Sequence, residues 1–277
     1  MKDILVIYHK IDSDGFGASW AAWLKFKDRA EYLGFDYLNG FPIEVKNKTI
    51  YLLDVSLDSK KIETLKENNN KIILIDHHLS SLKNKDLVDE FVVEIKHSAA
   101  VLAFKYFFKK KKMPKILKYI EDQDIWGFKL PHSREINLVI DLFENDYKKW
   151  NRYAKEIENP KKFKEFVKEG KKLIKYQDYL LKRILSQAVL VEFEGYKVLA
   201  VNSPILISEA GNLLCKKRPP MAIVWSFNSN KKKISLRSDG SIDVSKIAEK
   251  YGGGGHKGAA SFVLPINTDL PWKIINS

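Results

Sequence analysis

Short apolar runs alternate with helix-forming segments through the first half of the chain. Residues 4–9, 49–55 and 71–78 are rich in β-branched residues and predict strands. Residues 15–30 and 57–70, which lie between these runs, have the spacing of apolar positions expected of helices. Because strands that alternate with helices form βαβ units, the pattern predicts a parallel sheet in an α/β domain.

The middle of the chain has a predominantly helical pattern. Residues 97–108 and 114–126 extend the helical part of the first domain. Residues 135–187 are almost wholly helical in pattern and rich in lysine. We interpret this last segment as a helical connector.

The pattern changes from residue 188, where apolar and polar positions alternate. One predicted hairpin turns at Glu194 and Gly195, a second turns between residues 228 and 232, and a helix-like segment follows each. The sequence therefore predicts an α/β protein in three parts: a parallel-sheet domain at 1–134, the connector at 135–187, and a smaller C-terminal α/β domain at 188–277.

Composition narrows the class of protein. The chain has 277 residues, of which 45% are hydrophobic, and this is enough for a sizeable core. Its first apolar run covers about six residues, too short for a signal peptide, and no later segment approaches the roughly 20 apolar residues of a membrane span. We therefore expect a cytoplasmic protein with no membrane partner. The formal net charge of +13 favours an anionic substrate, although lysine runs are also typical of solvated helix faces.

Acidic and imidazole side chains follow all three predicted strands of the first domain. They are His9, Asp12 and Asp14 after the first, Asp54 after the second, and Asp76, His77 and His78 after the third. Parallel strands place their carboxyl ends at one edge of a sheet, where ligands bind. Clustered carboxylates repel one another unless a cation neutralises them, and mixed carboxylate and imidazole ligands suit Mn²⁺, Fe²⁺, Co²⁺ or Zn²⁺. The number of ligands favours two ions about 3.5–4 Å apart, an arrangement used in phosphoryl hydrolysis.

Simpler roles exist for individual members of this set. Asp54 or Asp76 alone could be a helix N-cap, but three successive strand ends with such residues favour a shared site. The block EDQD offers two more acids, Asp122 and Asp124, either of which could complete the second metal's coordination or simply end a helix. Asp122 is our first choice.

Two features of the last domain suit phosphate binding. Consecutive glycines from Gly252 to Gly255 allow backbone N–H groups to converge on an anion, although a turn before the last strand is the alternative. Arg237 offers a planar fork that grips phosphate with two hydrogen bonds, and an ordinary surface ion pair is the alternative there.

Five blocks, HKIDSDG, LLD, IDHH, EDQD and GGGGHKGAAS, occur in this order and resemble the DHH/DHHA1 phosphoesterases, named for the triplet at residues 76–78. The resemblance extends from His9 to Ser261, and it implies a two-domain enzyme with a two-manganese active site in the cleft between the domains. In the first block only Lys10 and Ile11 separate His9 from Asp12, whereas many family members have three residues there.

The resemblance also implies roles for particular residues. His9 and Asp12 would hold one ion, Asp14, His77 and Asp122 the other, and Asp54 would bridge both. Asp76 would orient a neighbouring imidazole, and His78 would face the substrate phosphate. The second domain would bind phosphate and nucleotide through Arg237, Gly253, Gly254, Gly255 and His256. His97 and Ser98 resemble a segment that lines the cleft, and a capped core helix is equally compatible with them.

The expected function is that of a manganese-dependent phosphoesterase that cleaves short 5′-phosphorylated oligoribonucleotides or linear dinucleotides to nucleoside monophosphates. A water between the two ions would attack phosphorus. Alternatives within the enzyme class are a 3′-phosphoadenosine 5′-phosphate phosphatase and a polyphosphate or pyrophosphate hydrolase. A nucleic-acid-binding or nucleotide-binding module without catalysis is the alternative from another class. The oligomeric state is left open, a homodimer included.

Overall fold

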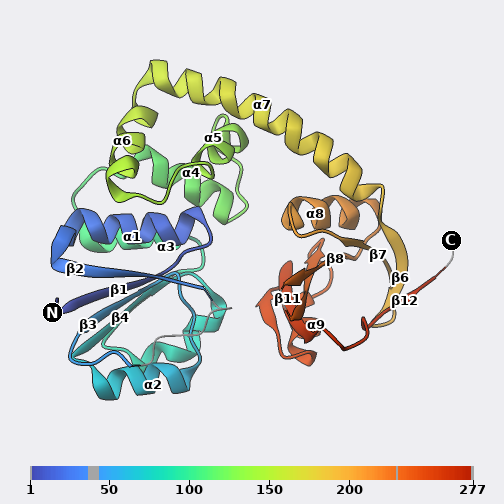
Figure 1. The fold of residues 1–277 in the computed structure, drawn as a ribbon, viewed down its shortest axis with the longest axis horizontal. Coiled ribbons are helices and arrows are strands. Elements are labelled where there is room, and N and C mark those ends of the chain that lie inside the picture. Colours follow the sequence, from blue (N-terminus) through green and yellow to red (C-terminus); the bar gives the residue numbers. More distant parts are fainter. Residues whose placement is uncertain (1, 37–43, 229, 276–277) are drawn as a thin grey trace. The chain divides into compact units, whose positions relative to one another are not determined.

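A computed structural model describes residues 2–36, 44–228 and 230–275, and the chain divides into two compact units, Met1–Ile174 and Lys175–Ser277 (Figure 1). Within these described ranges, no helix combines the length and the apolar character needed to cross a membrane.

The first unit contains a five-stranded parallel sheet in the order β2-β1-β3-β4-β5. Its strands are β1 (Ile4–His9), β2 (Ala30–Phe35), β3 (Thr49–Leu53), β4 (Lys71–Asp76) and β5 (Glu90–Val93). Three of these were predicted. The two edge strands β2 and β5 were not, because both are partly exposed and lack the continuous apolar run that marks β1, β3 and β4.

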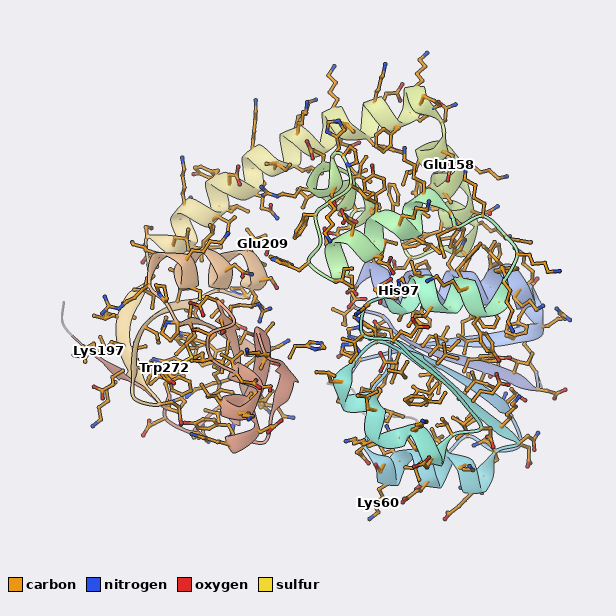
Figure 2. The ribbon with its side chains drawn as sticks, turned by 180° about the vertical axis from the view of Figure 1, so that it is seen from behind. Lys60, His97, Glu158, Lys197, Glu209 and Trp272 are labelled. Carbon is orange, nitrogen blue, oxygen red and sulfur yellow. The ribbon has the colours of Figure 1, made fainter. Side chains whose placement is uncertain are left out.

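Helices cover both faces of this sheet. The helices of the first unit are α1 (Ser13–Phe26), α2 (Ser59–Asn68), α3 (Ala99–Phe107), α4 (Lys115–Asp124), α5 (Ser133–Ile140) and α6 (Tyr147–Glu158), with 3₁₀ segments η1 (Lys27–Arg29) and η2 (Leu79–Leu87). Side chains of β1 alternate, so Val6 packs with α1 and α3 while Leu5 and Ile7 pack with α2. Figure 1 shows α1 and α3 on one side of the strands and α2 on the other. In the view from behind, the exposed Lys60 of α2 points away from the sheet (Figure 2).

Part of the segment that we expected to be a connector belongs to the first unit. Trp150, Ala154 and Ile157 of α6 are buried in the same cluster as Trp20 of α1. The long helix α7 (Pro160–Leu185) crosses the boundary between the two units. The three-part division of the chain stays a prediction.

The second unit is a mixed seven-stranded sheet in the order β10-β11-β9-β8-β7-β6-β12, in which only β7 and β8 pair in parallel among the described residues. Its elements are β6 (Val189–Phe193), β7 (Tyr196–Asn202), α8 (Ile207–Lys217), β8 (Met221–Asn228), β9 (Lys231–Ser238), α9 (Val244–Lys250), β10 (Gly254–His256), β11 (Ala259–Pro265) and β12 (Lys273–Ile274). Helices α8 and α9 pack with opposite faces of the sheet. The unit is therefore the smaller α/β domain that the sequence predicts.

Both predicted hairpins are present. Glu194 and Gly195 form a two-residue turn between β6 and β7, and both have the positive φ angles (51° and 81°) that match the twist of a tight hairpin. The second hairpin joins β8 and β9, and the part of its predicted turn at Ser229 lies outside the described residues.

Candidate metal centre

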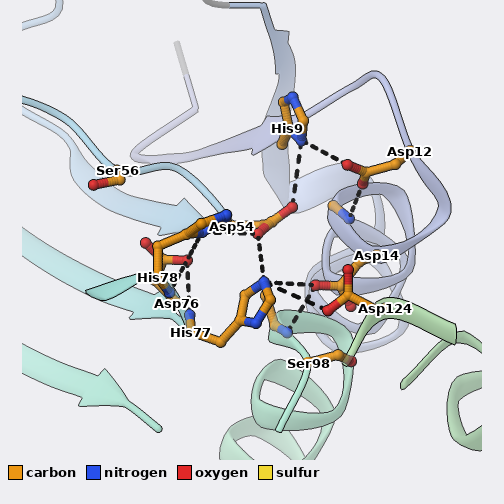
Figure 3. A network of polar contacts seen from close by, with 12 residues as sticks. His9, Asp12, Asp14, Asp54, Ser56, Asp76, His77, His78, Ser98 and Asp124 are labelled. Carbon is orange, nitrogen blue, oxygen red and sulfur yellow. Dashed lines mark hydrogen bonds and ion pairs between the residues drawn. The ribbon is translucent and has the colours of Figure 1, made fainter. Parts of the chain in front are cut away.

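The carboxyl ends of three adjacent strands bring the predicted ligands together (Figure 3). His9 ends β1, Asp54 follows β3 directly, and Asp76 ends β4 just before His77 and His78. Because β1, β3 and β4 are neighbours in a parallel sheet, residues from three distant parts of the sequence lie within contact distance.

Asp54 lies at the centre of this cluster. Its side chain is 2% exposed, its Oδ2 atom is 3.5 Å from His9 Nδ1, and its Oδ1 atom is 3.5 Å from His77 Nε2. Asp54 Oδ1 is buried and has no hydrogen-bond partner within the described part of the chain. The backbone is also left-handed here, with φ of 58°, a conformation that costs about 1–3 kcal/mol in a residue other than glycine. A buried carboxylate oxygen without a donor is well suited to bind a cation.

Two groups of donor atoms lie on either side of Asp54. On one side His9 Nδ1 is 2.9 Å from Asp12 Oδ2. On the other, His77 Nε2 is 3.5 Å from Asp124 Oδ2 and 3.8 Å from Asp14 Oδ2. The first group consists of His9, Asp12 and Asp54, and the second of Asp14, His77 and Asp124. Within each group, one ligand atom from each residue lies within 4.8 Å of the ligand atoms of the other two. A third set of donor atoms, from Asp54, Asp76, His77 and His78, meets the same distance criterion, so Asp54 belongs to two of the three groups found among the described residues.

The start of α1 holds the first group in place. Asp12 is the N-cap of α1 and accepts a hydrogen bond from Gly15 N at 2.9 Å. A Cβ atom at Gly15 would lie 2.0 Å from the carbonyl oxygen of His9. Only glycine therefore allows the helix to begin this close to the end of β1, which keeps His9 and Asp12 in contact.

The start of α3 holds Asp14. Both carboxylate oxygens of Asp14 accept backbone hydrogen bonds, from Ala99 N at 2.8 Å and Ala100 N at 2.9 Å. Ser98 is the buried N-cap of α3, and His97 Nδ1 is 2.9 Å from Glu121 Oε2. The capped core helix considered for His97 and Ser98 is thus present, and it orients a candidate ligand. Sequence reasoning missed these backbone donors because N–H groups leave no mark in the residue types.

The structure places Asp124, not Asp122, in the cluster, so we revise our first choice. The carboxylate of Asp122 accepts hydrogen bonds from Lys129 N at 2.8 Å and Leu130 N at 2.9 Å, which fixes the loop after α4. Burial tends to raise the pKa of Asp122, but its hydrogen bonds with Ser133 and these backbone groups hold the pKa below the ordinary value. Asp122 is fully used as an acceptor for its own loop.

The helical register explains why the two acids differ. Residues two apart point about 200° away from each other around a helix. Asp124 continues the row of Ile116 and Ile120, whose side chains are buried. Asp122 instead lies one turn after Tyr119, whose hydroxyl donates to the carbonyl oxygen of Pro131 in the same loop. Both rows contain buried residues, so the apolar pattern along α4 does not by itself distinguish Asp124 from Asp122.

Asp76 orients His78. Asp76 is fully buried, and its Oδ1 atom contacts His78 Nδ1 at 2.8 Å while accepting from the backbone of His77 at 2.7 Å. Its Oδ2 atom accepts a hydrogen bond from Ser81 Oγ. Its contact with Nδ1 of His78 puts Asp76 in a position to orient that imidazole ring.

The electrostatics of the cluster fit a site for cations. Burial, followed by the charge of Asp54, raises the pKa of Asp14 to about 7, and burial with the charges of Asp14 and Asp54 raises the pKa of Asp124 well above its ordinary value. Burial lowers the pKa of His77, but its contacts with Asp54 and Asp14 outweigh this effect and raise the pKa to about 9. The pKa of His9 rises to about 10, because Asp12 and Asp54 outweigh the opposing effect of burial. The cluster retains protons that a divalent cation would replace.

In the second unit, Arg237 is held against α8. Its Nη2 atom donates to Ser208 Oγ at 2.8 Å, and its Nη1 atom donates to the carbonyl oxygen of Leu236 at 2.9 Å. Burial lowers the pKa of this guanidinium, opposed by the charge of Glu209. A fixed and largely desolvated guanidinium is a stronger candidate for anion binding than a mobile surface arginine.

The glycine run has a structural purpose at its start. Gly252, with φ of 73°, donates to the carbonyl oxygen of Glu249 at 3.0 Å, and Gly253 donates to that of Ala248 at 2.9 Å. This pair of bonds is the Schellman motif that ends a helix. The N–H of Gly253 is therefore engaged, which counts against the anion nest that we expected there. Gly254, Gly255 and His256 form β10 and pair with β11.

Comparison with known proteins agrees with this architecture. The models of the "DHH family, N-terminal domain" and of the "DHHA1 domain" match residues 3–125 and 189–271. The chain is 29% identical over 303 residues to the uncharacterized protein R106 of Acanthamoeba polyphaga mimivirus, covering 98% of this chain and 70% of that protein. It is 25% identical over 290 residues to the oligoribonuclease NrnB of Bacillus subtilis (strain 168), covering 92% and 71%.

A solved structure shares the fold. It is the DHH domain of a protein described as a member of a family of ribosomal proteins, with a TM-score of 0.61 and 16% identity, covering 94% of this chain and 82% of that one. The order of the two matched domains agrees with the assignment of a DHH domain followed by a DHHA1 domain. The parallel sheet of the first unit and the acidic cluster at its edge are consistent with this assignment. The chain is therefore a member of the DHH phosphoesterase family, in which a DHHA1 domain follows the DHH domain.

Proposed function

We propose that this metal-dependent phosphoesterase hydrolyses short 5′-phosphorylated oligoribonucleotides or linear dinucleotides to nucleoside monophosphates, with Mn²⁺ as its preferred metal. The observation that carries the proposal is the buried Asp54 carboxylate, one oxygen of which accepts no hydrogen bond from the described residues, among imidazole and carboxylate donors. The likeness to an oligoribonuclease over 92% of the chain supports the substrate class. The mixed nitrogen and oxygen donors support Mn²⁺ over Mg²⁺.

We assign the donor atoms to two ions. His9 and Asp12 would hold one, and Asp14, His77 and Asp124 the other, with Asp54 between them. When bound, a pair of such ions lowers the pKa of a water and stabilises negative charge on a phosphoryl group. Strand ends and helix starts hold these donors in position, and the backbone bonds to Asp14 are an example.

We assign a substrate-contacting role to His78. Burial lowers the pKa of His78, but the hydrogen bond with Asp76 and the charge of that carboxylate outweigh this effect and raise the pKa to about 9 in the metal-free protein. Because Nδ1 faces Asp76, Nε2 is the atom that would donate a hydrogen bond to a phosphate oxygen. Asp76 is a positioning residue in this arrangement.

We assign anion recognition in the second unit to Arg237, whose guanidinium is already oriented by Ser208. Gly254, Gly255 and His256 follow the helix cap and are the part of the glycine run that we keep as candidates for phosphate contact. The capping bonds of Gly253 give that residue a different role.

The proposal is tested by product analysis. We expect the protein with Mn²⁺ to release nucleoside monophosphates from a 5′-phosphorylated RNA dinucleotide, and excess chelator to abolish release. Asp54→Ala should lower the rate at least about a thousandfold, because it removes the carboxylate shared by both donor groups. His132→Gln, at an exposed imidazole outside the cluster, is the matched control and should retain full activity.

Two other results would contradict the proposal in different ways. Hydrolysis of 3′-phosphoadenosine 5′-phosphate, polyphosphate or pyrophosphate in place of the dinucleotide would keep the metal centre and reject the substrate. Metal-independent binding of long RNA with steep salt dependence and no turnover would reject the enzyme activity itself.

A further inference from the structure

The segment that follows α4 exposes two apolar side chains, and it starts directly after a candidate metal ligand in the sequence. Ile125 and Trp126 are 42% and 49% exposed, and Trp126 comes two residues after Asp124, whose carboxylate is 3.5 Å from His77 Nε2. A tryptophan is usually much more deeply buried than this. Only one residue separates Trp126 from Asp124, so the two Cα atoms are within about 7 Å of each other.

The backbone holds this tryptophan in a fixed and unfavourable conformation. Trp126 has φ of 58° and Phe128 has φ of 48°, values that are outliers for bulky residues. Trp126 N donates to the carbonyl oxygen of Gln123 at 2.8 Å, and Gly127 and Phe128 donate to that of Asp122 at 2.8 and 3.0 Å. Together with the two bonds to the Asp122 carboxylate, these contacts over-determine the loop.

The rings are arranged so that one supports the other. The Trp126 and Phe128 centroids are 5.0 Å apart with an interplanar angle of 81°, an edge-to-face contact. Such a contact uses one edge or face of the indole and fixes its orientation. Residues in strained conformations held by many bonds cluster at ligand-binding sites. The loop therefore presents a rigid aromatic surface rather than a mobile one.

We propose that Trp126 is the stacking platform for a nucleobase of the substrate, supported by Phe128 and by the loop that Asp122 fixes. This inference rests on the proposed function, since it assumes that the phosphoester at the metal centre joins nucleosides. Every base has a π-face, so stacking accepts different bases and adds affinity without reading sequence. The platform would also distinguish nucleotide phosphoesters from inorganic polyphosphates, which have no ring to stack.

The test is a double-substitution cycle between protein and substrate. Trp126→Ala and the unchanged protein are each assayed on a 5′-phosphorylated RNA dinucleotide and on versions made abasic at either position. We expect loss of the indole or loss of the stacked base each to lower kcat/KM roughly tenfold or more, and loss of both to cost little beyond either alone. Trp126→Phe should restore much of the loss, whereas an alanine effect that merely reflected loop packing would multiply with removal of the base and would overturn the proposal.

Two further arms separate this inference from the proposed function. Tyr176→Ala, at a tyrosine that is 63% exposed on α7, is the matched control and should leave the rates on the dinucleotide and on its two abasic versions unchanged. If the unchanged protein fails to cleave the dinucleotide, the proposed substrate is wrong and stacking is measured by equilibrium binding. Adenosine monophosphate should then bind more tightly than ribose 5-phosphate, and Trp126→Ala should abolish that difference. Equal affinity of the unchanged protein for both compounds would overturn the platform.

Discussion

Two turns of this molecule use the same left-handed backbone conformation for different purposes. After β3, Asp54 adopts φ of 58°, and its buried Oδ1 atom is left without a hydrogen-bond donor in the described part of the chain. After α9, Gly252 adopts φ of 73°, and its N–H and that of Gly253 both bond to carbonyl oxygens of the helix.

The two turns differ in purpose, because Asp54 belongs to the candidate metal centre and Gly252 caps the end of α9. Glycine adopts the left-handed conformation without a steric penalty, and the bonds that result complete the end of a helix. An aspartate in the same conformation is strained, and here it brings a carboxylate among imidazoles and other acids at one edge of the sheet. A strained residue with unmet polar needs marks function more reliably than a flexible one whose polar groups are satisfied.

Among the variants considered in this section, Asp124→Asn should have the largest effect on activity. Replacing a candidate metal ligand should lower activity by at least roughly 100-fold, because even the partners of ligands typically cost 10–100-fold when removed. The urea midpoint of the metal-free variant should be at least as high as that of the unchanged protein, since one of several neighbouring acids that repel one another is gone. Activity is followed with the dinucleotide, and unfolding with urea.

Asp122→Asn is the matched control from the same helix. It replaces one of two carboxylate oxygens that accept backbone bonds with an N–H₂ group, which leaves Lys129 N or Leu130 N without an acceptor. We expect a loss of about 1–3 kcal/mol in the free energy of unfolding and retention of bound metal. Loss of metal in Asp122→Asn with unchanged stability would restore our first choice of ligand.

These two acids also show what could be predicted from the sequence. The ligands at three strand ends could be predicted because β1, β3 and β4 are continuous apolar runs, which mark where each strand ends. Parallel strands align their carboxyl ends, so these ligands were expected to lie close together. The choice between Asp122 and Asp124 depends on which neighbours each row of α4 faces and on a loop whose backbone donors carry no sequence signature. The edge strands β2 and β5 were missed for a related reason, since half-exposed strands have no pattern distinct from loops.

The free energy of unfolding of the metal-free protein, measured against pH, tests whether the cluster around Asp54 holds protons in place of cations. His77 has a folded-state pKa of about 9, above its ordinary value of 6.5, so its stabilising effect is complete below about pH 6.5 and is lost as pH rises through 9. Asp14 acts with the same sign, because its pKa is raised from 3.8 to about 7 and its contribution is lost as pH rises through 7. The metal-free protein should therefore become less stable between pH 6 and pH 8.5.

Added metal should reverse this trend. Cations replace the protons of the cluster, so the stabilisation by Mn²⁺ should grow with pH, and calorimetric titrations in buffers of different ionisation enthalpy should show proton release on binding. Urea unfolding at both pH values, with and without metal under anaerobic conditions, measures the first effect. Equal stability of the metal-free protein at pH 6 and pH 8.5 would show that the buried acids are neutralised in another way.

The smallest expected effect distinguishes the two halves of the glycine run. A Cβ atom at Gly254 would meet no atom within 4 Å, so Gly254→Ala should leave the unfolding midpoint unchanged, whereas a Cβ atom at Gly253 would lie 2.2 Å from the carbonyl oxygen of Ser261 and Gly253→Ala should lose about 1–3 kcal/mol. If a phosphate approaches the bare backbone of β10, the extra methyl at Gly254 should raise KM a few-fold without changing stability. A KM that stays the same in Gly254→Ala would mean that the run serves only to end α9 and start β10, and that Arg237 carries anion recognition in this unit without it.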